Sequence, residues 1–585
     1  MSLARITPFT ALACDYDGTL ASEDHIGAEV LGALERAREV GLRLILVTGR
    51  TFFELVRVCE RLDLFDGVVA ENGGVLYFPA EGRIRDLAPT PPLGLLAELD
   101  RREIAFHVGR VVVATTRTAE AQVREALAAV GATLAIFYNR DALMLLPAGI
   151  SKGSGVRHVI RHLGLSFHDV LALGDAENDL ELFEACGWAA CPANAVAELK
   201  EHADWVFDGV NGQAIARAIL GPMLGGLLPL RYSRRHRIAV GWAVKTSEPV
   251  TVPARGINLL IQGDPLSGKS WLAGALVERL VSHQYAVCVL DPEGDFHILA
   301  RLPGVLWAEV RDGASLDNAL NSFVADPSAC VVVDFSRLPH GRKVELVERG
   351  LSAIRELRCR LGLPHWVVLD EAQYLLHREG VAGEAIGIED RGFCLITYRL
   401  SWLRASVRKA IDVLIAARTT FPEEVASLRA FLTEAFGEDA DVISVLPHLP
   451  AGEFLLLHAE ETEPSRAVTF VPMPRETAHV RHRKKYAEAL LLPDQRFYLL
   501  APEGKVVAVA GSLNEFVQAL ATTEERVLAH HATRKDFSRW IMGVFNDQDL
   551  GRAVRKLESR WMRGEIPNLR EAMQHLVTHY YGSAS

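Results

Sequence analysis

The segment Gly263-Asp264-Pro265-Leu266-Ser267-Gly268-Lys269-Ser270 decides the fold of the central part of the chain. An apolar run at 257–261 precedes it and a run with helical spacing follows it, so the sequence predicts a strand, a glycine loop and a helix. Such a loop turns successive backbone N–H groups toward phosphate oxygens, and the helix N-terminus favours negative charge. Lys269 and Ser270 are placed to reach the terminal phosphates and Mg²⁺. We therefore predict that all eight residues bind a nucleoside triphosphate, with ATP as the substrate.

A second apolar run, at 365–369, ends in Asp370 and Glu371. Uninterrupted apolar runs are typical of strands buried on both faces of a parallel sheet, and ligands bind at the carboxyl ends of such strands. We expect Asp370 to hold Mg²⁺ through water and Glu371 to orient or deprotonate the attacking water. A carboxylate in that role favours ATP hydrolysis over transfer to a hydroxyl group.

Two further strand ends extend the pattern. The run 286–290 ends in Asp291-Pro292-Glu293-Gly294-Asp295-Phe296, and the run 331–333 ends in Asp334. Together with the glycine loop and the Asp-Glu-Ala-Gln strand end, they make the region 237–475 resemble the HerA/FtsK superfamily of P-loop motor ATPases. The resemblance implies a RecA-like parallel-sheet domain and a ring, often of six subunits, with nucleotide at the subunit boundaries. It therefore implies a homo-oligomer.

One position departs from that family. The family usually places a polar sensor, often Gln, after its next strand, whereas the run 393–397 here leads into Tyr398 and Arg399. Thr397 is the candidate sensor instead. Arg399 and Arg418 are candidates for an arginine finger or a phosphate contact, and the alternative is that both are ordinary solvated loop arginines.

The N-terminal region carries a different pattern. A short apolar run at 11–14 ends in Asp15-Tyr16-Asp17-Gly18-Thr19. One of two such carboxylates can attack phosphorus and become an aspartyl phosphate, while the other donates a proton to the leaving oxygen and later activates water. Mg²⁺ must screen the repulsion between an anionic nucleophile and an anionic substrate.

This segment resembles the haloacid dehalogenase (HAD) superfamily, whose further motifs follow in order at Thr48-Gly49-Arg50, at Lys152 and at 174–179. The resemblance implies an α/β, Rossmannoid core. Carried over by position, it also implies the following roles: Asp15 as nucleophile, Asp17 as acid/base, Thr48, Gly49 and Lys152 as phosphate-binding residues, and Asp15, Asp17, Asp175 and Asp179 as Mg²⁺ ligands.

Residues from about 80 to 148 look like the inserted α+β cap of the Cof-like and sucrose- or phosphoglycolate-phosphatase-like branch, with a strand at 111–114 and a helix at 120–130. In that branch the cap selects the substrate. Its small size favours a modest phosphorylated metabolite, such as a sugar phosphate or phosphoglycolate. Arg110, Asn139 and Arg140 are candidate contacts, with surface or structural roles as the alternative.

At 585 residues the chain is expected to form several domains. The glycine-rich segment 221–226 breaks the periodicity, so we place a phosphatase domain at 1–222 and an ATPase domain at 228–475. The remainder, 486–585, reads as a small α+β, mostly helical accessory domain that resembles a recurring microbial module of unknown function. Its His530-His531 pair lacks companions at ligand spacing, which favours a packing or capping role.

Composition limits the partners. The net charge of −11 gives no general attraction to nucleic acid, so such binding needs a local patch. The basic clusters 231–237 and 481–485 are candidates, with a solvated charge run as the alternative for the first and an interdomain linker for the second. Eight cysteines without a Cys-x-x-Cys pair fit free thiols in a reducing cytoplasm, and no apolar run is long enough to span a membrane.

Three functional hypotheses remain open. The leading one joins a Mg²⁺-dependent phosphomonoesterase to a HerA/FtsK-like ATPase. The second is a polynucleotide kinase–phosphatase, in which Asp291 would act as a base toward a 5′ hydroxyl, and Glu371 argues against it. The third makes the P-loop region a nucleotide-controlled scaffold or sensor that assembles the phosphatase.

Overall fold

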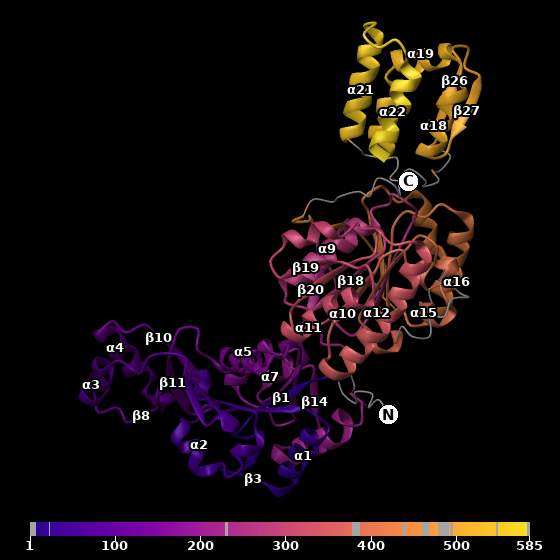
Figure 1. Ribbon diagram of the computed structural model, residues 1–585. Coiled ribbons are helices and arrows are strands. Elements are labelled where there is room, and N and C mark those ends of the chain that lie inside the picture. Colours follow the sequence, from indigo (N-terminus) through magenta and orange to yellow (C-terminus); the bar gives the residue numbers. More distant parts are fainter. Residues whose placement is uncertain are drawn as a thin grey trace.

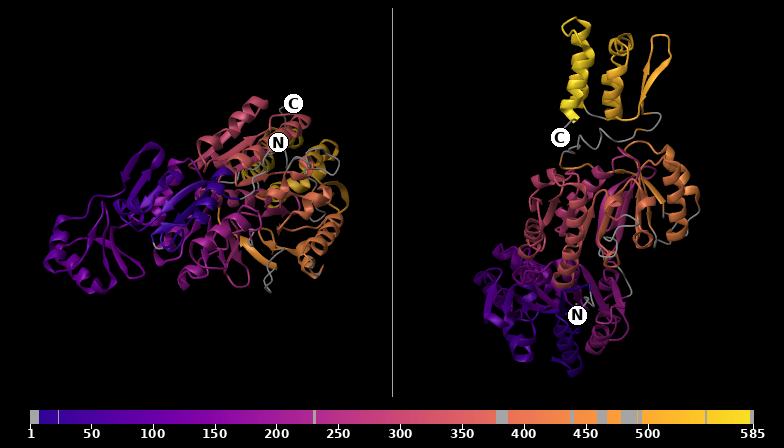
Figure 2. Two further views of the ribbon diagram at one scale, coloured as in Figure 1. Left: turned by 90° about the horizontal axis from the view of Figure 1, so that it is seen from below. Right: turned by 45° about the vertical axis from the view of Figure 1, so that its right-hand side comes forward.

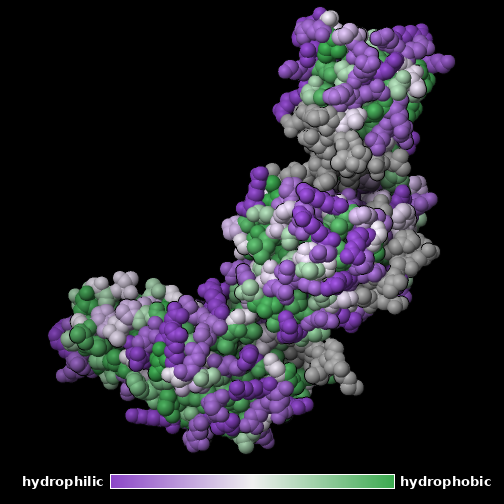
Figure 3. Space-filling view, in the orientation of Figure 1, coloured by the Kyte–Doolittle hydropathy of each residue, from purple (hydrophilic) through white to green (hydrophobic). Residues whose placement is uncertain are grey.

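The computed structural model describes residues 8–22, 24–228, 232–376, 387–436, 440–458, 467–477, 491, 495–545 and 548–581. Three parts follow one another along the molecule, from the indigo N-terminal part through the central part to the yellow C-terminal part (Figures 1 and 2). Hydrophilic and hydrophobic side chains are interspersed over the visible face of all three (Figure 3). Within the described residues, no helix has the length and apolar character needed to cross a membrane.

The N-terminal part is built on an eight-stranded sheet in the order β14-β13-β12-β1-β4-β5-β6-β7. Its strands are β1 (Ala11–Asp15), β4 (Arg43–Val47), β5 (Gly67–Ala70), β6 (Val75–Phe78), β7 (Arg83–Asp86), β12 (Val170–Leu173), β13 (Trp188–Pro192) and β14 (Trp205–Phe207). All pairs from β14 to β5 are parallel, and β6 and β7 are antiparallel additions.

Helices cover both faces of this sheet because consecutive strand residues point to opposite sides. Side chains of α1 (Ala28–Glu39) and α8 (Asn211–Ala218) share one buried cluster with Leu12 and Leu44. Side chains of α5 (Lys152–His162) and α6 (Leu180–Ala185) share the other with Ala13 and Ile45. The predicted Rossmannoid α/β arrangement is thus present, with β1 at its centre.

The cap is a four-stranded antiparallel sheet in the order β10-β11-β9-β8. It comprises β8 (His107–Val108), β9 (Val113–Thr116), β10 (Leu134–Asn139) and β11 (Ala142–Pro147), with α3 (Leu93–Arg101) and α4 (Glu120–Val130). The helices pack on one face of this sheet, while Met144 and Leu146 on the other face meet Phe52 of the core. The predicted cap start near residue 80 is too early, because β7 still pairs with β6 in the core sheet.

The central part is built on an eleven-stranded sheet in the order β16-β15-β25-β24-β23-β17-β22-β21-β18-β20-β19. Its strands are β15 (Arg237–Ala243), β16 (Pro249–Pro253), β17 (Asn258–Gln262), β18 (Val287–Asp291), β19 (Val305–Glu309), β20 (Cys330–Asp334), β21 (Trp366–Leu369), β22 (Phe393–Thr397), β23 (Val413–Ala416), β24 (Phe454–His458) and β25 (Ala467–Pro472). The seven strands from β23 to β19 are parallel to one another.

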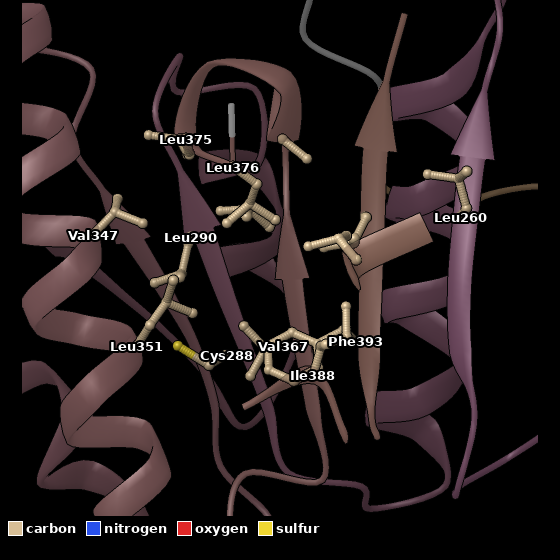
Figure 4. Packing of buried hydrophobic residues seen from close by; sticks show 14 of the residues in the cluster. Leu260, Cys288, Leu290, Val347, Leu351, Val367, Leu375, Leu376, Ile388 and Phe393 are labelled. Carbon is tan, nitrogen blue, oxygen red and sulfur yellow. The ribbon is translucent and has the colours of Figure 1, made fainter. Parts of the chain in front are cut away.

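Both faces of the central sheet are buried under helices. Leu272 and Leu276 of α9 (Lys269–Ser282) pack on one face, and Val347 and Leu351 of α12 (His340–Leu361) pack on the other. Figure 4 shows this second face, where Val347 and Leu351 lie against Leu290 of β18. The apolar runs that predicted buried parallel strands are therefore explained by a sheet covered on both sides.

The C-terminal part consists of a hairpin, β26 (Phe497–Leu500) and β27 (Val506–Ala510), and the helices α18 (Leu513–Thr522), α19 (Glu525–Thr533), α20 (Asp536–Val544), α21 (Gln548–Met562) and α22 (Leu569–Tyr581). His531 is buried, where its Nε2 accepts a hydrogen bond of 2.8 Å from the Leu500 N–H and its Nδ1 lies 2.9 Å from Asp536 Oδ2. These contacts give His531 a packing role. Leu266 of the glycine loop packs against the same apolar cluster.

The described part of the basic segment, residues 232–237, lies between the N-terminal and central parts. Arg235 Nη1 donates to the Phe183 carbonyl at 2.6 Å and Arg235 Nη2 lies 2.8 Å from Asp204 Oδ2, while Arg237 bonds Thr251. Arg235 and Arg237 are therefore engaged within the chain, whereas Arg234 is exposed, so binding of nucleic acid by this cluster stays a prediction. The other basic cluster, 481–485, lies outside the described residues.

Candidate active sites

The first candidate site lies at the carboxyl ends of β1 and β12, which are neighbours in the sheet. Asp15 is the last residue of β1, and Asp175 follows β12 after one glycine. Because the two strands are parallel, both carboxylates emerge at the same edge. Asp179, four residues beyond Asp175, joins them, and one oxygen of each buried carboxylate lies within 4.8 Å of the others.

Lys152 holds this group of carboxylates together. It is the first residue of α5, whose N-terminus is fixed by a reciprocal capping box between Ser151 and Ser154. Its Nζ lies 2.6 Å from Asp15 Oδ1 and 2.6 Å from Asp179 Oδ1. Burial by itself lowers the pKa of Lys152, but the two carboxylates outweigh burial and raise it, so the ammonium stays charged.

The site carries an excess of negative charge. Burial and then the neighbouring Asp179 raise the pKa of Asp15, and the same two causes raise the pKa of Asp175. Asp179 Oδ2 accepts the backbone N–H groups of Asp175 and Ala176 at 3.0 and 3.1 Å, which fixes its orientation. Three buried carboxylates against one ammonium form a set of hard oxygen donors suited to a divalent cation. The donor set therefore fits Mg²⁺.

Asp17 lies apart from this group. Its carboxylate forms a two-pronged pair with Arg50, with 2.8 Å between Arg50 Nε and Asp17 Oδ2 and 2.5 Å between Arg50 Nη2 and Asp17 Oδ1. Arg50 also binds Asp24. A role for Asp17 as acid/base requires its carboxylate to leave Arg50, and this role and its role as a Mg²⁺ ligand stay predictions.

Thr48 and Gly49 follow β4 beside the same edge. Thr48 is fully buried, and its Oγ1 accepts a hydrogen bond of 3.1 Å from the Arg50 N–H. A Cβ at Gly49 would lie 3.3 Å from Met144 Sδ of the cap and 3.5 Å from Asn178 Nδ2. The cap therefore closes tightly over this residue, and a larger side chain would crowd the junction.

Arg140 reaches the site from the cap. It lies at the turn between β10 and β11 with a φ of 52°, its Nη2 binds Asp175 Oδ2, and its backbone N–H lies 3.3 Å from Glu177 Oε2. From the sequence, Arg140 was one of three cap residues predicted as possible substrate contacts. By contrast, Arg110 pairs with Asp86 at 2.7 Å. The sequence held no signal to separate these two arginines, because only the tertiary fold brings the turn to Asp175.

Glu71 is a residue whose role sequence reasoning missed. It is fully buried with a φ of 53°, and its carboxylate accepts the backbone N–H groups of Arg110, Val111 and Val112 at 3.0, 2.8 and 3.1 Å. It thereby fastens the cap to the core beside Thr48-Gly49. The available signal was an acidic residue directly after the apolar run of β5.

The second candidate site is the glycine loop between β17 and α9. Gly268 has a φ of 95°, and a Cβ at Gly263 would lie 2.6 Å from that of Ala417, so both positions require glycine. Lys269 Nζ donates to the Asp264 carbonyl at 2.8 Å. Asp264 Oδ2 accepts from both the N–H and the hydroxyl of Thr420, at 2.9 and 2.8 Å. Ser270 is the second residue of α9.

A chain of hydrogen bonds lies at the ends of β21 and β22. Thr397 Oγ1, at the end of β22, donates to Gln373 Oε1 at 2.7 Å, and Gln373 Nε2 donates to Glu371 Oε2. Asp370 and Glu371 directly follow β21, and both are buried. The structure thus links the predicted sensor Thr397 to Glu371 through Gln373, a residue that the sequence analysis gave no role of its own.

The two candidate arginines have partners within the chain. Arg399 Nη1 lies 3.8 Å from Glu424 Oε1, and its guanidinium lies 5.2 Å from the Phe421 ring centre. The Arg418 carbonyl accepts the Asp264 N–H at 2.9 Å, which places this residue beside the glycine loop. A role for Arg418 in phosphate contact and a finger role for Arg399 stay predictions.

The Asp291 carboxylate forms hydrogen bonds with the loop that follows it. Its Oδ1 accepts the N–H groups of Gly294 and Asp295 at 2.7 and 3.1 Å, and its Oδ2 accepts that of Phe296 at 2.8 Å. Both carboxylate oxygens therefore shape the turn.

Comparisons with known proteins concern the N-terminal part. A family model described as haloacid dehalogenase-like hydrolase matches residues 12–86 and 97–219. A phosphoglycolate phosphatase of Methanothermobacter thermautotrophicus is 34% identical over 218 residues, which cover 36% of this chain and 96% of that protein. A phosphoglycolate phosphatase of Halorubrum lacusprofundi is 31% identical over 205 residues, which cover 33% of this chain and 89% of that protein. A solved haloacid dehalogenase-like hydrolase from Bacteroides thetaiotaomicron aligns at 19% identity with a TM-score of 0.32, over 36% of this chain and 98% of that one.

The chain therefore belongs, through its N-terminal part, to the haloacid dehalogenase-like hydrolases. These two matches in sequence show a HAD-type phosphatase in the N-terminal part, which confirms the predicted superfamily for this part of the chain.

Proposed function

We propose that the chain combines two phosphohydrolases, a Mg²⁺-dependent phosphomonoesterase in its N-terminal part and an ATPase in its central part. The carrying observation is the position of Lys152, 2.6 Å from both Asp15 and Asp179, within a buried group of three carboxylates. A lysine held in this way is ready to bind the oxygens of an incoming phosphoryl group beside the nucleophile.

The phosphatase reaction has two steps. An Asp15 oxygen attacks phosphorus and the ester bond breaks, while Asp17, released from Arg50 and protonated, gives its proton to the departing oxygen. Asp17 then takes a proton from water, whose oxygen attacks phosphorus, and inorganic phosphate leaves with Asp15 restored. Throughout, Lys152 and the Thr48 hydroxyl hold the phosphoryl oxygens, and Asp179 keeps Lys152 in place.

Mg²⁺ supplies charge neutralisation between the anionic nucleophile and the phosphoryl group when it is bound. Asp15 and Asp175 would hold it directly, with Asp179 beside them, and Thr19 Oγ1 donates to Asp175 Oδ1 at 3.2 Å to orient that ligand. Asp17, the fourth predicted Mg²⁺ ligand, could bind the ion only after its carboxylate separates from Arg50.

The substrate we propose is a small phosphomonoester of the phosphoglycolate type. Two relatives carry that name and match at 34% and 31% identity. The cap supports a small substrate, since Met144 packs close to Gly49 at the phosphate-binding edge. A sugar phosphate is the larger alternative.

For the central part we propose HerA/FtsK-like ATP hydrolysis. The glycine loop would hold the phosphates, Ser270 and Asp370 would hold Mg²⁺, and Glu371 would activate the attacking water. The support is the chain of hydrogen bonds from Thr397 through Gln373 to Glu371, which fixes this carboxylate at the end of β21, two strands from the β17 strand that leads into the loop. Such a fixed carboxylate suits water activation.

The contacts of Asp291 argue against a polynucleotide kinase. A kinase of this kind needs a carboxylate free to accept a proton from a 5′ hydroxyl, whereas both Asp291 oxygens accept backbone N–H groups.

The scaffold hypothesis differs from the ATPase hypothesis in the expected rate of ATP turnover, because ATP would drive assembly with negligible hydrolysis. We further propose a homo-oligomeric ring, with nucleic acid or protein as its load.

Two single substitutions test the pair of activities. Asp15→Asn should abolish phosphate release from p-nitrophenyl phosphate and leave ATP hydrolysis intact, and Lys269→Ala should do the reverse. Loss of both activities from either change would refute two independent sites. Transfer of label from ATP to a 5′-hydroxyl oligonucleotide would establish the kinase, and ATP-dependent assembly in light scattering without turnover would establish the scaffold.

A further inference from the structure

Arg140 occupies a position that the phosphatase mechanism leaves unused. It is carried by the cap, yet its guanidinium binds Asp175 Oδ2 at the edge where the nucleophile Asp15 emerges. A Cβ added to Gly18 would lie 2.9 Å from Arg140 Nη2, so the guanidinium lies directly over the loop that follows Asp15. The Arg140 side chain is nevertheless 56% exposed, which leaves it free to swing about the hairpin turn.

The other described arginines of the cap are engaged away from the site. Arg101 and Arg102 pair with Glu98, Arg124 pairs with Glu120, and Arg117 lies over the Tyr138 ring. Arg110 pairs with Asp86. Among the described cap arginines, Arg140 is therefore the one that pairs with a carboxylate of the reaction centre.

Two cations compete for the Asp175 carboxylate. Asp175 is a proposed ligand of Mg²⁺, and Arg140 holds one of its oxygens in the structure. A carboxylate bound to a divalent cation has less attraction left for a guanidinium, so metal loading should weaken the Arg140–Asp175 contact. The released guanidinium would then stand beside the phosphoryl site with its donors facing the leaving group.

We propose that Arg140 is the specificity-determining residue of the phosphatase: it pairs with Asp175 before the metal binds and afterwards binds a carboxylate on the substrate's leaving group. This inference rests on the proposed phosphatase function. The fork of a guanidinium matches a carboxylate through two parallel hydrogen bonds, whereas a neutral leaving group offers it no such partner. The apolar neighbours Met144 and Phe52 then restrict the space to a short leaving group.

The test compares 2-phosphoglycolate with ethyl phosphate, which has a similar length and no carboxylate. Arg140→Gln should raise the KM for 2-phosphoglycolate by about 10- to 100-fold, since a charge-assisted pair is lost, and change kcat by less. The KM for ethyl phosphate should change by less than about threefold. Arg140→Lys should fall between wild type and Arg140→Gln, because it keeps the charge without the fork. Arg124→Gln, which removes an exposed cap arginine, is the matched control.

A second measurement follows the exchange at Asp175 without any turnover. Mn²⁺ binding to the full chain, titrated by electron paramagnetic resonance in the absence of substrate, should tighten several-fold in Arg140→Gln, since the competing cation is gone. Unchanged Mn²⁺ affinity would overturn the exchange, and equal KM changes for both esters would overturn the selection. If wild type cleaved neither ester, the phosphatase proposal itself would fail. If wild type cleaved both without preference, only the role of Arg140 would fail.

Discussion

Asp169 and His365 face each other across the boundary between the N-terminal and central parts, with 3.4 Å between Asp169 Oδ2 and His365 Nε2 and both side chains fully buried. Asp169 Oδ1 also lies 2.5 Å from Arg255 Nη1. Asp169 directly precedes β12, which leads to Asp175, and His365 directly precedes β21, which leads to Asp370. The two parts are thus fastened at the bases of the strands that carry both candidate sites.

Removing the charge of Asp169 should destabilise the whole junction. Asp169→Asn leaves the Arg255 guanidinium without its carboxylate, and breaking a largely buried pair from one side costs about 3 kcal/mol. We expect a loss of that size in the free energy of unfolding in urea, followed by tryptophan fluorescence. Glu39→Gln, which breaks an exposed pair with Arg36, should cost less than about 0.5 kcal/mol and serves as control. Equal losses from the two variants would contradict the role of the junction.

The same junction should be sensitive to acid. Burial lowers the pKa of His365 and, together with the nearby His365, lowers that of His168 well below the ordinary value of 6.5. Asp169 opposes the shift of both histidines, whereas Arg255 and Arg358 add to that of His365. The unfolded chain therefore binds more protons than the folded chain once the pH falls below about 6.5.

The contribution of these neutral histidines to the free energy of unfolding is therefore fully present above about pH 6.5. It decreases as the pH falls, by about 1.4 kcal/mol per histidine per pH unit, until the pH reaches the pKa of that histidine in the folded chain. Urea unfolding at pH 7.5 and 5.5 checks this slope. His365→Gln should make this slope shallower, and His162→Gln, at an exposed histidine, should change it less. A slope that survives His365→Gln would place the sensitive group elsewhere.

Metal binding should stabilise the N-terminal part. The three buried carboxylates repel one another, and a single lysine does not neutralise them. A cation that binds only the folded state adds about 2.7 kcal/mol to the free energy of unfolding at a hundredfold excess over its Kd. We expect Mg²⁺ to raise the melting temperature relative to EDTA in calorimetry, and Asp175→Asn to remove most of the increase. Asp86→Asn, a matched change outside this group, should keep it. An increase that persists in Asp175→Asn would contradict the assigned ligands.

The sequence could predict those strand and loop positions of both candidate sites that lie close together along the chain. Asp15, Asp175 and the glycine loop were singled out because a buried strand that ends in a polar residue or a glycine forms a local pattern. The positions of Arg140 and Glu71 depend on how the cap folds back onto the core, and no spacing along the chain records that contact. The ion pair between Asp17 and Arg50 could not be predicted for the same reason, since the two residues lie 33 positions apart in the sequence.

The hydrogen-bond chain from Thr397 to Glu371 supplies the sharpest test of the central part. Thr397→Val keeps the shape of a buried side chain but removes the hydroxyl that holds Gln373 Oε1, so Gln373 no longer fixes Glu371. We expect kcat for ATP hydrolysis to fall by about 10- to 100-fold, the size of one lost positioning contact. The Kd for ATP, measured by titration calorimetry, should stay within about twofold because the glycine loop is untouched. Thr433→Val, at an exposed threonine of α16 (Pro422–Phe436), is the control. A weaker Kd with unchanged kcat would instead make Thr397 a binding residue and leave Glu371 without its positioning chain.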